Sequence, residues 1–286
     1  MKTYDSPPAN LQSLQARVAQ QELGQDDANR RHFLMAMVVV SQMMPEGMVI
    51  KGGSAMVLRY GTGVRRTTDV DSARALAEDD VLDLFEENLR DGWAGFTGVL
   101  KQLKKPSPRD VPSDYVTSKF QVKLGFRGKS WKSVDFELVQ NEIGSAASSH
   151  LAMPDELVNL FTAIGLPAPE PAPVMGAEYQ VAQKIHALTS PGSERAHDLV
   201  DLQLLEKHEA IDLGQTKLLC ERLFRYRQRQ AWPPMLTPGQ GWKELYDTAR
   251  ASLRDPADVA DYDGALCWFG RFLEDIVLCT TLNSDE

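Results

Sequence analysis

The chain has 286 residues, 43% of them hydrophobic and 25% charged, which is typical of a globular protein with one large domain or two smaller ones. No run of 18 or more apolar residues occurs, so the sequence predicts no membrane-spanning helix. With 40 Asp and Glu against 31 Lys and Arg, the net charge of −9 argues against a general nucleic-acid binder but not against a local positive patch.

The N-terminus, the cysteines and the histidines indicate the cellular compartment and whether a zinc site is present. Residues 1–5 lack the apolar core of a signal peptide. Cys220, Cys267 and Cys279 show no metal-ligand spacing, and the 5 histidines are scattered. We therefore expect a cytoplasmic protein with reduced cysteines and no zinc site.

The first half of the chain alternates helical and extended patterns. Helices are expected at residues 9–23 and 26–43, the second with a buried apolar run, and another at 79–89. Strands are expected at 48–51 and 96–103, and residues 64–71 lead into a further strand. Residues 104–113 are rich in Pro and charge and predict a loop.

A hairpin follows, with arms at 115–126 and 131–139 around a turn at 127–129. In its second arm, Val134, Phe136 and Leu138 alternate with Ser133, Asp135 and Glu137, so one face is apolar and the other acidic.

The second half of the chain is predominantly helical. Residues 142–175 predict helix fragments and a stiff, Pro-rich connector at 167–173, where we place a domain boundary. Helices are expected beyond it, at 177–189, 195–207, 213–230, 240–253 and 258–280. The predicted organisation is N-terminal helices at 1–45 packed on a core domain at 46–165, followed by a helical domain at 175–286.

The most informative stretch is residues 51–71. Gly52, Gly53 and Ser54 follow an apolar strand and let the backbone approach a phosphate, to which Ser54 can hydrogen-bond. Asp69 and Asp71 are two apart, so in a strand they lie on one face, where a cation such as Mg²⁺ would offset their repulsion. A phosphate cradle beside paired carboxylates indicates a nucleoside triphosphate (NTP) site. Arg65 and Thr67 share this face if the strand begins early.

Four segments carry a family resemblance: Lys51-Gly-Gly-Ser-Ala55, Arg65-Arg-Thr-Thr-Asp-Val-Asp71, Lys184-Ile-His-Ala-Leu188 and Arg195-Ala-His-Asp-Leu-Val-Asp-Leu202. In order and character they resemble the AbiEii/AbiGii nucleotidyltransferase family, the toxin half of type IV toxin–antitoxin and abortive-infection systems, related to MenT-type tRNA nucleotidyltransferase toxins. The resemblance covers roughly residues 10–206. Ser72 departs from it, since the family tends to have an apolar residue there.

The resemblance implies an α+β nucleotidyltransferase fold, with a mixed sheet flanked by helices and a helical C-terminal domain. It implies one or two Mg²⁺ ions held by Asp69, Asp71 and a third carboxylate, for which Asp135 is the candidate and Glu137 the alternative. The hairpin pattern also allows both of these to face solvent only. Nucleotide-binding residues would be Gly52, Gly53, Ser54, Arg65, Thr67 and Lys184.

Lys184 and Asp198 would take part in catalysis by the same resemblance. Lys184 lies beside the apolar stripe of Val181, Ile185 and Leu188, an unusual place for a solvated lysine. Asp198 shares a helix face with Asp201, and from the residues alone it is equally a structural partner of Arg195 or Lys184.

The implied function is Mg²⁺-dependent transfer of a nucleoside monophosphate (NMP) from an NTP to an acceptor, the 3′ end of tRNA, with a cognate antitoxin encoded nearby. The alternatives are nucleotidylation of a protein and a non-catalytic domain that binds nucleotide or a partner. Three basic clusters could contact RNA phosphates or lie solvated on the surface. They are residues 222–232, the set Lys101, Lys104, Lys105 and Arg109, and the hairpin set Lys119, Lys123, Arg127, Lys129 and Lys132.

Overall fold

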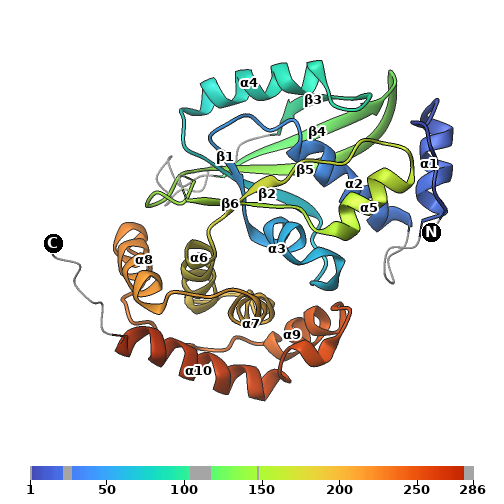
Figure 1. Cartoon of the computed structure of the whole chain (residues 1–286). Coiled ribbons are helices and arrows are strands. Elements are labelled where there is room, and N and C mark those ends of the chain that lie inside the picture. Colours follow the sequence, from blue (N-terminus) through green and yellow to red (C-terminus); the bar gives the residue numbers. More distant parts are fainter. Residues whose placement is uncertain (1, 22–27, 104–116, 147, 280–286) are drawn as a thin grey trace. The chain divides into compact units, whose positions relative to one another are not determined.

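The computed structural model describes residues 2–21, 28–103, 117–146 and 148–279 (Figure 1). The chain forms two compact units. The first consists of Met1–Gly63 and Thr67–Met175, and the second of Val64–Arg66 and Gly176–Glu286. The predicted three-part division at residues 45, 165 and 175 stays a prediction.

The first unit is built on a seven-stranded mixed sheet in the order β3-β4-β5-β2-β1-β7-β6. β2 pairs parallel with β5 and antiparallel with β1, and β1 pairs parallel with β7. This confirms the predicted α+β class. The strands are β1 (Met48–Ile50), β2 (Asp69–Arg74), β3 (Phe96–Gln102), β4 (Ser118–Phe126), β5 (Lys129–Gln140), β6 (Ser149–Ala152) and β7 (Ala172–Met175).

Helices flank this sheet, and Figure 1 shows α4 and α3 on opposite sides of it. The helices of the unit are α1 (Leu11–Ala19), α2 (Ala28–Ser41), α3 (Gly52–Tyr60), α4 (Glu78–Asp91) and α5 (Asp155–Ala163). The apolar run of α2 is buried, as the sequence predicts.

Alternation along the hairpin strands decides which face α4 covers. In β4, Phe120, Val122 and Leu124 are buried while Lys119 and Lys123 are exposed. Phe85 of α4 contacts Phe136 of β5, with ring centroids 5.2 Å apart. The apolar face of the sheet is therefore packed against α4, and the polar face is turned away from it.

Residues 142–175 differ from the prediction. The described part of this segment holds the helix α5 and the short strands β6 and β7. The expected Pro-rich connector ends in β7, where Ile50 is the parallel partner of Val174. The sequence did not predict this strand because Pro173 lacks the N–H that strand pairing needs, and a proline therefore argues against a strand. β2 also begins later than expected, at Asp69. The loop predicted at 104–113 lies outside the described residues.

The second unit is helical, as predicted. Its helices are α6 (Ala177–Thr189), α7 (Asp198–His208), α8 (Leu213–Arg227), α9 (Trp242–Ala251) and α10 (Tyr262–Leu278). Asp212 and Asp261 cap α8 and α10, accepting hydrogen bonds from the amides of Gln215 and Gly264. Within the part of the chain that the structure describes, no helix has the length and hydropathy needed to cross a membrane.

Candidate active site

Two adjacent strands place acidic side chains on one face of the sheet. The parallel register of β2 and β5 puts Asp69 beside Asp135 and Asp71 beside Glu137. The intervening pair, Val70 and Phe136, is buried on the opposite face. Four carboxylates thus share the polar face, although their two segments lie far apart in the sequence.

Asp69 carries the electrostatic cost of this arrangement. It is half-buried, and burial together with the charge of Asp71 raises the pKa of its carboxyl, with a smaller contribution from Glu137. Thr67 opposes this shift, since its hydroxyl donates to Asp69 Oδ1 over 3.1 Å. A carboxylate held at such a cost beside another is typical of a functional site, where a cation offsets the repulsion.

The start of α3 and the residue before it, Lys51, are bonded to β2 at both aspartates. Lys51 N donates to the carbonyl of Asp71 over 2.9 Å, and Ser54 Oγ donates to the carbonyl of Asp69 over 2.6 Å. Gly52 has a φ of +61°, and a Cβ there would lie 2.1 Å from Asp71 Oδ2. Only glycine therefore fits, and the N-terminal end of α3 begins directly against the carboxylate of Asp71.

The two candidates for a third carboxylate differ in their partners. Glu137 forms an ion pair with Lys119, its neighbour on β4, with a Nζ–Oε1 distance of 2.5 Å. The hydrogen bond and charge of Glu137 raise the pKa of Lys119, and Asp69 and Asp71 add to this. Asp135 is exposed and is approached by the neutral amide of Gln121, at 3.4 Å.

A divalent cation fits the Asp69–Asp71 pair by donor chemistry. Carboxylate oxygens are the ligands that Mg²⁺ prefers, and one or two of them suffice when water and substrate phosphates complete the coordination. Among the described residues, no group of three or more His, Cys, Asp or Glu stands close enough to hold an ion.

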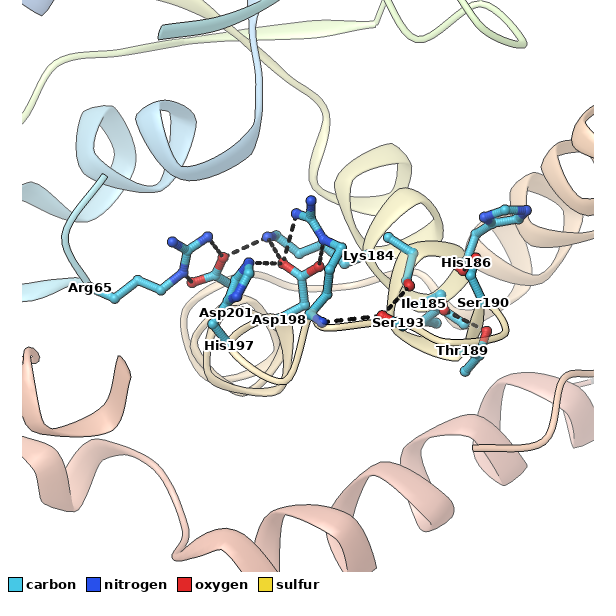
Figure 2. A network of polar contacts seen from close by, with 12 residues as sticks. Arg65, Lys184, Ile185, His186, Thr189, Ser190, Ser193, His197, Asp198 and Asp201 are labelled. Carbon is cyan, nitrogen blue, oxygen red and sulfur yellow. Dashed lines mark hydrogen bonds and ion pairs between the residues drawn. The ribbon is translucent and has the colours of Figure 1, made fainter. Parts of the chain in front are cut away.

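The second unit contains a buried ionic network (Figure 2). Lys184 of α6 donates to Asp198 Oδ1 over 2.7 Å and to Asp201 Oδ2 over 2.5 Å. Lys184 is 4% exposed, and both aspartate side chains are fully buried in α7. The ammonium group thus bridges two carboxylates away from water.

Two arginines complete the network. Arg65 binds Asp201 through two parallel hydrogen bonds of 2.8 and 2.7 Å, and Arg195 donates to Asp198 Oδ2 over 2.6 Å. Three cationic side chains face two carboxylates, so the network has a net charge of +1.

Protonation in this network follows from its pairing. Burial alone would raise the pKa of both aspartates, but Lys184 and Arg195 hold the pKa of Asp198 well below its usual range, and Arg65 and Lys184 lower that of Asp201. Burial lowers the pKa of His197 to about 4, so this histidine is neutral at pH 7. The positive charge of the network therefore comes from Lys and Arg alone.

Asp198 contacts both Lys184 and Arg195, the two partners considered from its sequence position. Arg65 and Thr67 precede β2 rather than extending it, so the condition for their shared strand face is not met. Sequence reasoning did not assign Asp201 to the network, nor Lys119 to an ion pair with an acidic residue of the site. The spacing of three from Asp198 marked Asp201, whereas nothing in the sequence pairs Lys119 with Glu137.

Comparison with known proteins decides the family. The model of the family described as nucleotidyl transferase AbiEii toxin, type IV TA system, matches residues 41–269. The chain belongs to this family. It is therefore a nucleotidyltransferase, and the resemblance described above is confirmed. No curated protein matches this toxin.

One solved structure confirms the fold of the toxin. It is similar to MenT4, a nucleotidyltransferase toxin from Mycobacterium tuberculosis H37Rv, with a TM-score of 0.50, 16% identity, and coverage of 93% of this chain and 99% of that one. A putative nucleotidyltransferase from H. pylori also matches, at 14% identity and a TM-score of 0.45, covering 86% of this chain and 92% of that one.

We predict that Asp69→Asn raises the melting temperature of the metal-free toxin at pH 7, on the order of 2 °C. The raised pKa of Asp69 means that its ionised form disfavours the fold, so stability is lost as pH rises through the interval between its unfolded and folded pKa. The gain should vanish below both values. Thermal unfolding in EDTA measures it, with the exposed Asp83→Asn as control. An Asp69→Asn melting temperature no higher than that of the wild type at pH 7 would contradict the conclusion that ionised Asp69 destabilises the fold.

We also predict that Lys184→Met destabilises the toxin by about 3 kcal/mol, because two buried carboxylates lose a shared partner. The matched Lys207→Met removes an exposed ion pair with Asp258 and should cost less than about 1 kcal/mol. Urea unfolding followed by circular dichroism compares them. Adding Asp198→Asn to Lys184→Met should recover part of the loss, and equal losses in the two lysine variants would refute the structural weight given to the network.

Proposed function

We propose that this toxin transfers an NMP from an NTP to the 3′ end of a tRNA, with Mg²⁺ as its metal. The observation that carries the proposal is the Asp69–Asp71 pair directly against the start of α3. One element offers carboxylates for a cation and the other offers backbone amides for a phosphate. Family membership adds an NTP substrate and an antitoxin partner.

The metal ligands in this proposal are Asp69 and Asp71, with Asp135 as the candidate third, and they would hold one or two Mg²⁺ ions. When bound, Mg²⁺ supplies positive charge that offsets the carboxylates and the triphosphate. Thr67 fixes the orientation of Asp69 through its hydrogen bond. Asp135 either completes this ligand set or accepts the proton of the attacking hydroxyl, because its carboxylate is not neutralised by Lys119 as that of Glu137 is.

The phosphate contacts are assigned to the start of α3. The first amides of a helix have no partner within it and attract anions. Gly52 and Gly53 add no side chain of their own at this end, and Ser54 offers its amide, since its hydroxyl donates to the Asp69 carbonyl. These residues would hold the β and γ phosphates of the NTP.

Lys184 and Arg65 are assigned a supporting electrostatic role toward the phosphates. Their network retains a net charge of +1 after pairing with Asp198 and Asp201. Asp198 fixes the position of the Lys184 ammonium group through a buried ion pair. Positive charge fixed in advance needs no reorganisation when the leaving pyrophosphate forms.

The decisive experiment incubates the purified toxin with Mg²⁺, total tRNA and each of four α-labelled NTPs, followed by denaturing gels. Label should appear on tRNA and disappear with EDTA. The Asp69→Ala/Asp71→Ala variant should lose about 10³-fold or more in rate, the scale expected when groups that act as a unit are removed. The variant must keep its circular dichroism spectrum, and Mg²⁺ should raise the melting temperature of the wild type but not of the variant.

Each other outcome corrects a named part of the proposal. Label on polypeptide identifies a protein acceptor. Transfer that persists in the double variant places the active site elsewhere. NTP binding without transfer to any acceptor indicates a binding role.

The third carboxylate is tested by the matched variants Asp135→Asn and Glu137→Gln. We predict that Asp135→Asn lowers the transfer rate about 100-fold and Glu137→Gln less than 10-fold, because Lys119 already neutralises Glu137. Initial rates at saturating NTP compare the two. The reverse order would assign the role to Glu137.

A further inference from the structure

Strands β3 and β4 carry a charge pattern that the proposed site does not use. Together they contain three lysines, Lys101, Lys119 and Lys123, and no Asp or Glu, in a chain with 40 acidic and 31 basic residues. We define the lysine face as Thr97, Val99 and Lys101 of β3 with Lys119, Gln121 and Lys123 of β4.

The strand register makes this face continuous with the carboxylates. Val99 is paired with Lys123 and Lys101 with Gln121, while Lys119 is paired with Glu137. Paired residues point to the same side of a sheet. Since neighbouring strands are about 4.8 Å apart, β4 lies roughly 10 Å from the aspartates of β2, across β5.

The lysine face is the exposed face of these strands. Thr97, Val99, Lys101, Lys119 and Lys123 are exposed, whereas the alternate residues of β4 are buried on the side of α4. Figure 1 shows α4 on one side of the sheet only. Val99 has 66% of its surface exposed and is paired with Lys123, so an apolar side chain lies on this face among the lysines.

We propose that the lysine face binds a single-stranded end of the acceptor RNA and leads its terminal hydroxyl toward Asp69 and Asp71. This inference rests on the proposed RNA acceptor. The three lysines suit consecutive phosphates, Gln121 can hydrogen-bond a base edge, and Val99 offers an apolar contact to a base or ribose.

Charge complementarity favours a polyanion over a protein segment on this face. Lysines without intervening acids attract a phosphate chain along both strands. Next to β4, Lys119 neutralises Glu137, which reduces repulsion where the chain would approach β2. An exposed sheet face is also a known platform for single-stranded RNA.

The test is the Lys101→Gln/Lys123→Gln variant, which leaves Lys119 and the carboxylates intact. We expect the apparent KM for tRNA to rise about 10-fold, with the KM for NTP and the rate at saturating tRNA unchanged. The slope of log affinity against log salt should fall by about 1.4, for two phosphate contacts to a single strand. Val99→Thr should weaken tRNA binding without changing this slope.

The matched control is Arg127→Gln/Lys129→Gln, an equal charge change at the turn of the same hairpin, where Lys129 is paired with buried Phe126. The control should keep wild-type values. Equal effects in both double variants, or no effect of Lys101→Gln/Lys123→Gln, would overturn the inference.

A binding measurement that needs no turnover distinguishes failure of the proposed function from failure of the lysine-face inference. Fluorescence anisotropy of labelled tRNA is recorded with the Asp69→Ala/Asp71→Ala protein, with and without Lys101→Gln/Lys123→Gln. Lysine-dependent binding supports the face even when the wild type transfers no label to tRNA. Lysine-independent tRNA binding, or lysine-dependent labelling of a protein alone, rejects RNA as its occupant.

Discussion

The parallel pairing of β2 with β5 is the constraint on which the rest of the structure depends. It places Asp69 beside Asp135 and Asp71 beside Glu137, and it leaves Val70 and Phe136 on the opposite, buried face. A shift of one residue in either strand would bury carboxylates and expose the core, so the hydrophobic pattern enforces the register. The core thereby holds the acidic residues together against their repulsion. Lys51 and Ser54, at the start of α3, add to this, because their hydrogen bonds to the carbonyls of Asp71 and Asp69 fix β2 from a third element.

The carboxylates of the sheet and the Lys184 network differ in how far their charges are paired. On the sheet, carboxylates accumulate with a single described ion pair, to Lys119, and the raised pKa of Asp69 shows the resulting cost. In the helical unit, Lys184 and two arginines saturate Asp198 and Asp201, whose pKa values fall despite complete burial. The first cluster gains from a bound cation, whereas in the second each carboxylate already contacts two cationic side chains. The repulsion that no described ion pair offsets therefore lies at Asp69 and Asp71, the proposed metal ligands.

Local patterns predicted much of this structure. The apolar and acidic alternation of residues 133–138 identified β5 and its faces, and helical periodicity located α6 at its observed bounds. The short strands β6 and β7 were missed, because four residues carry little periodicity and Pro173 argues against a strand. Arg65 and Asp201 are 136 positions apart, and their pairing depends on how the helices pack rather than on either local sequence. The partners of Asp135 and Glu137 were equally hidden from the local sequence. Both side chains lie on the same face of β5, but only the pairing with β4 places Lys119 beside Glu137 and Gln121 beside Asp135.

The net charge of the chain does not describe the polar face of the sheet, because acidic and basic side chains lie on different strands there. On this face the carboxylates of Asp69, Asp71, Asp135 and Glu137 lie on β2 and β5. The lysine face lies on β3 and β4, so charge on the polar face changes from positive to negative along the order β3-β4-β5-β2. Averaged over the chain, this pattern disappears into a charge of −9. A polyanion approaching such a face is attracted at β3 and β4 and repelled at β2 unless a cation sits there. Binding of metal and of a phosphate chain would therefore reinforce each other, because each removes an obstacle to the other.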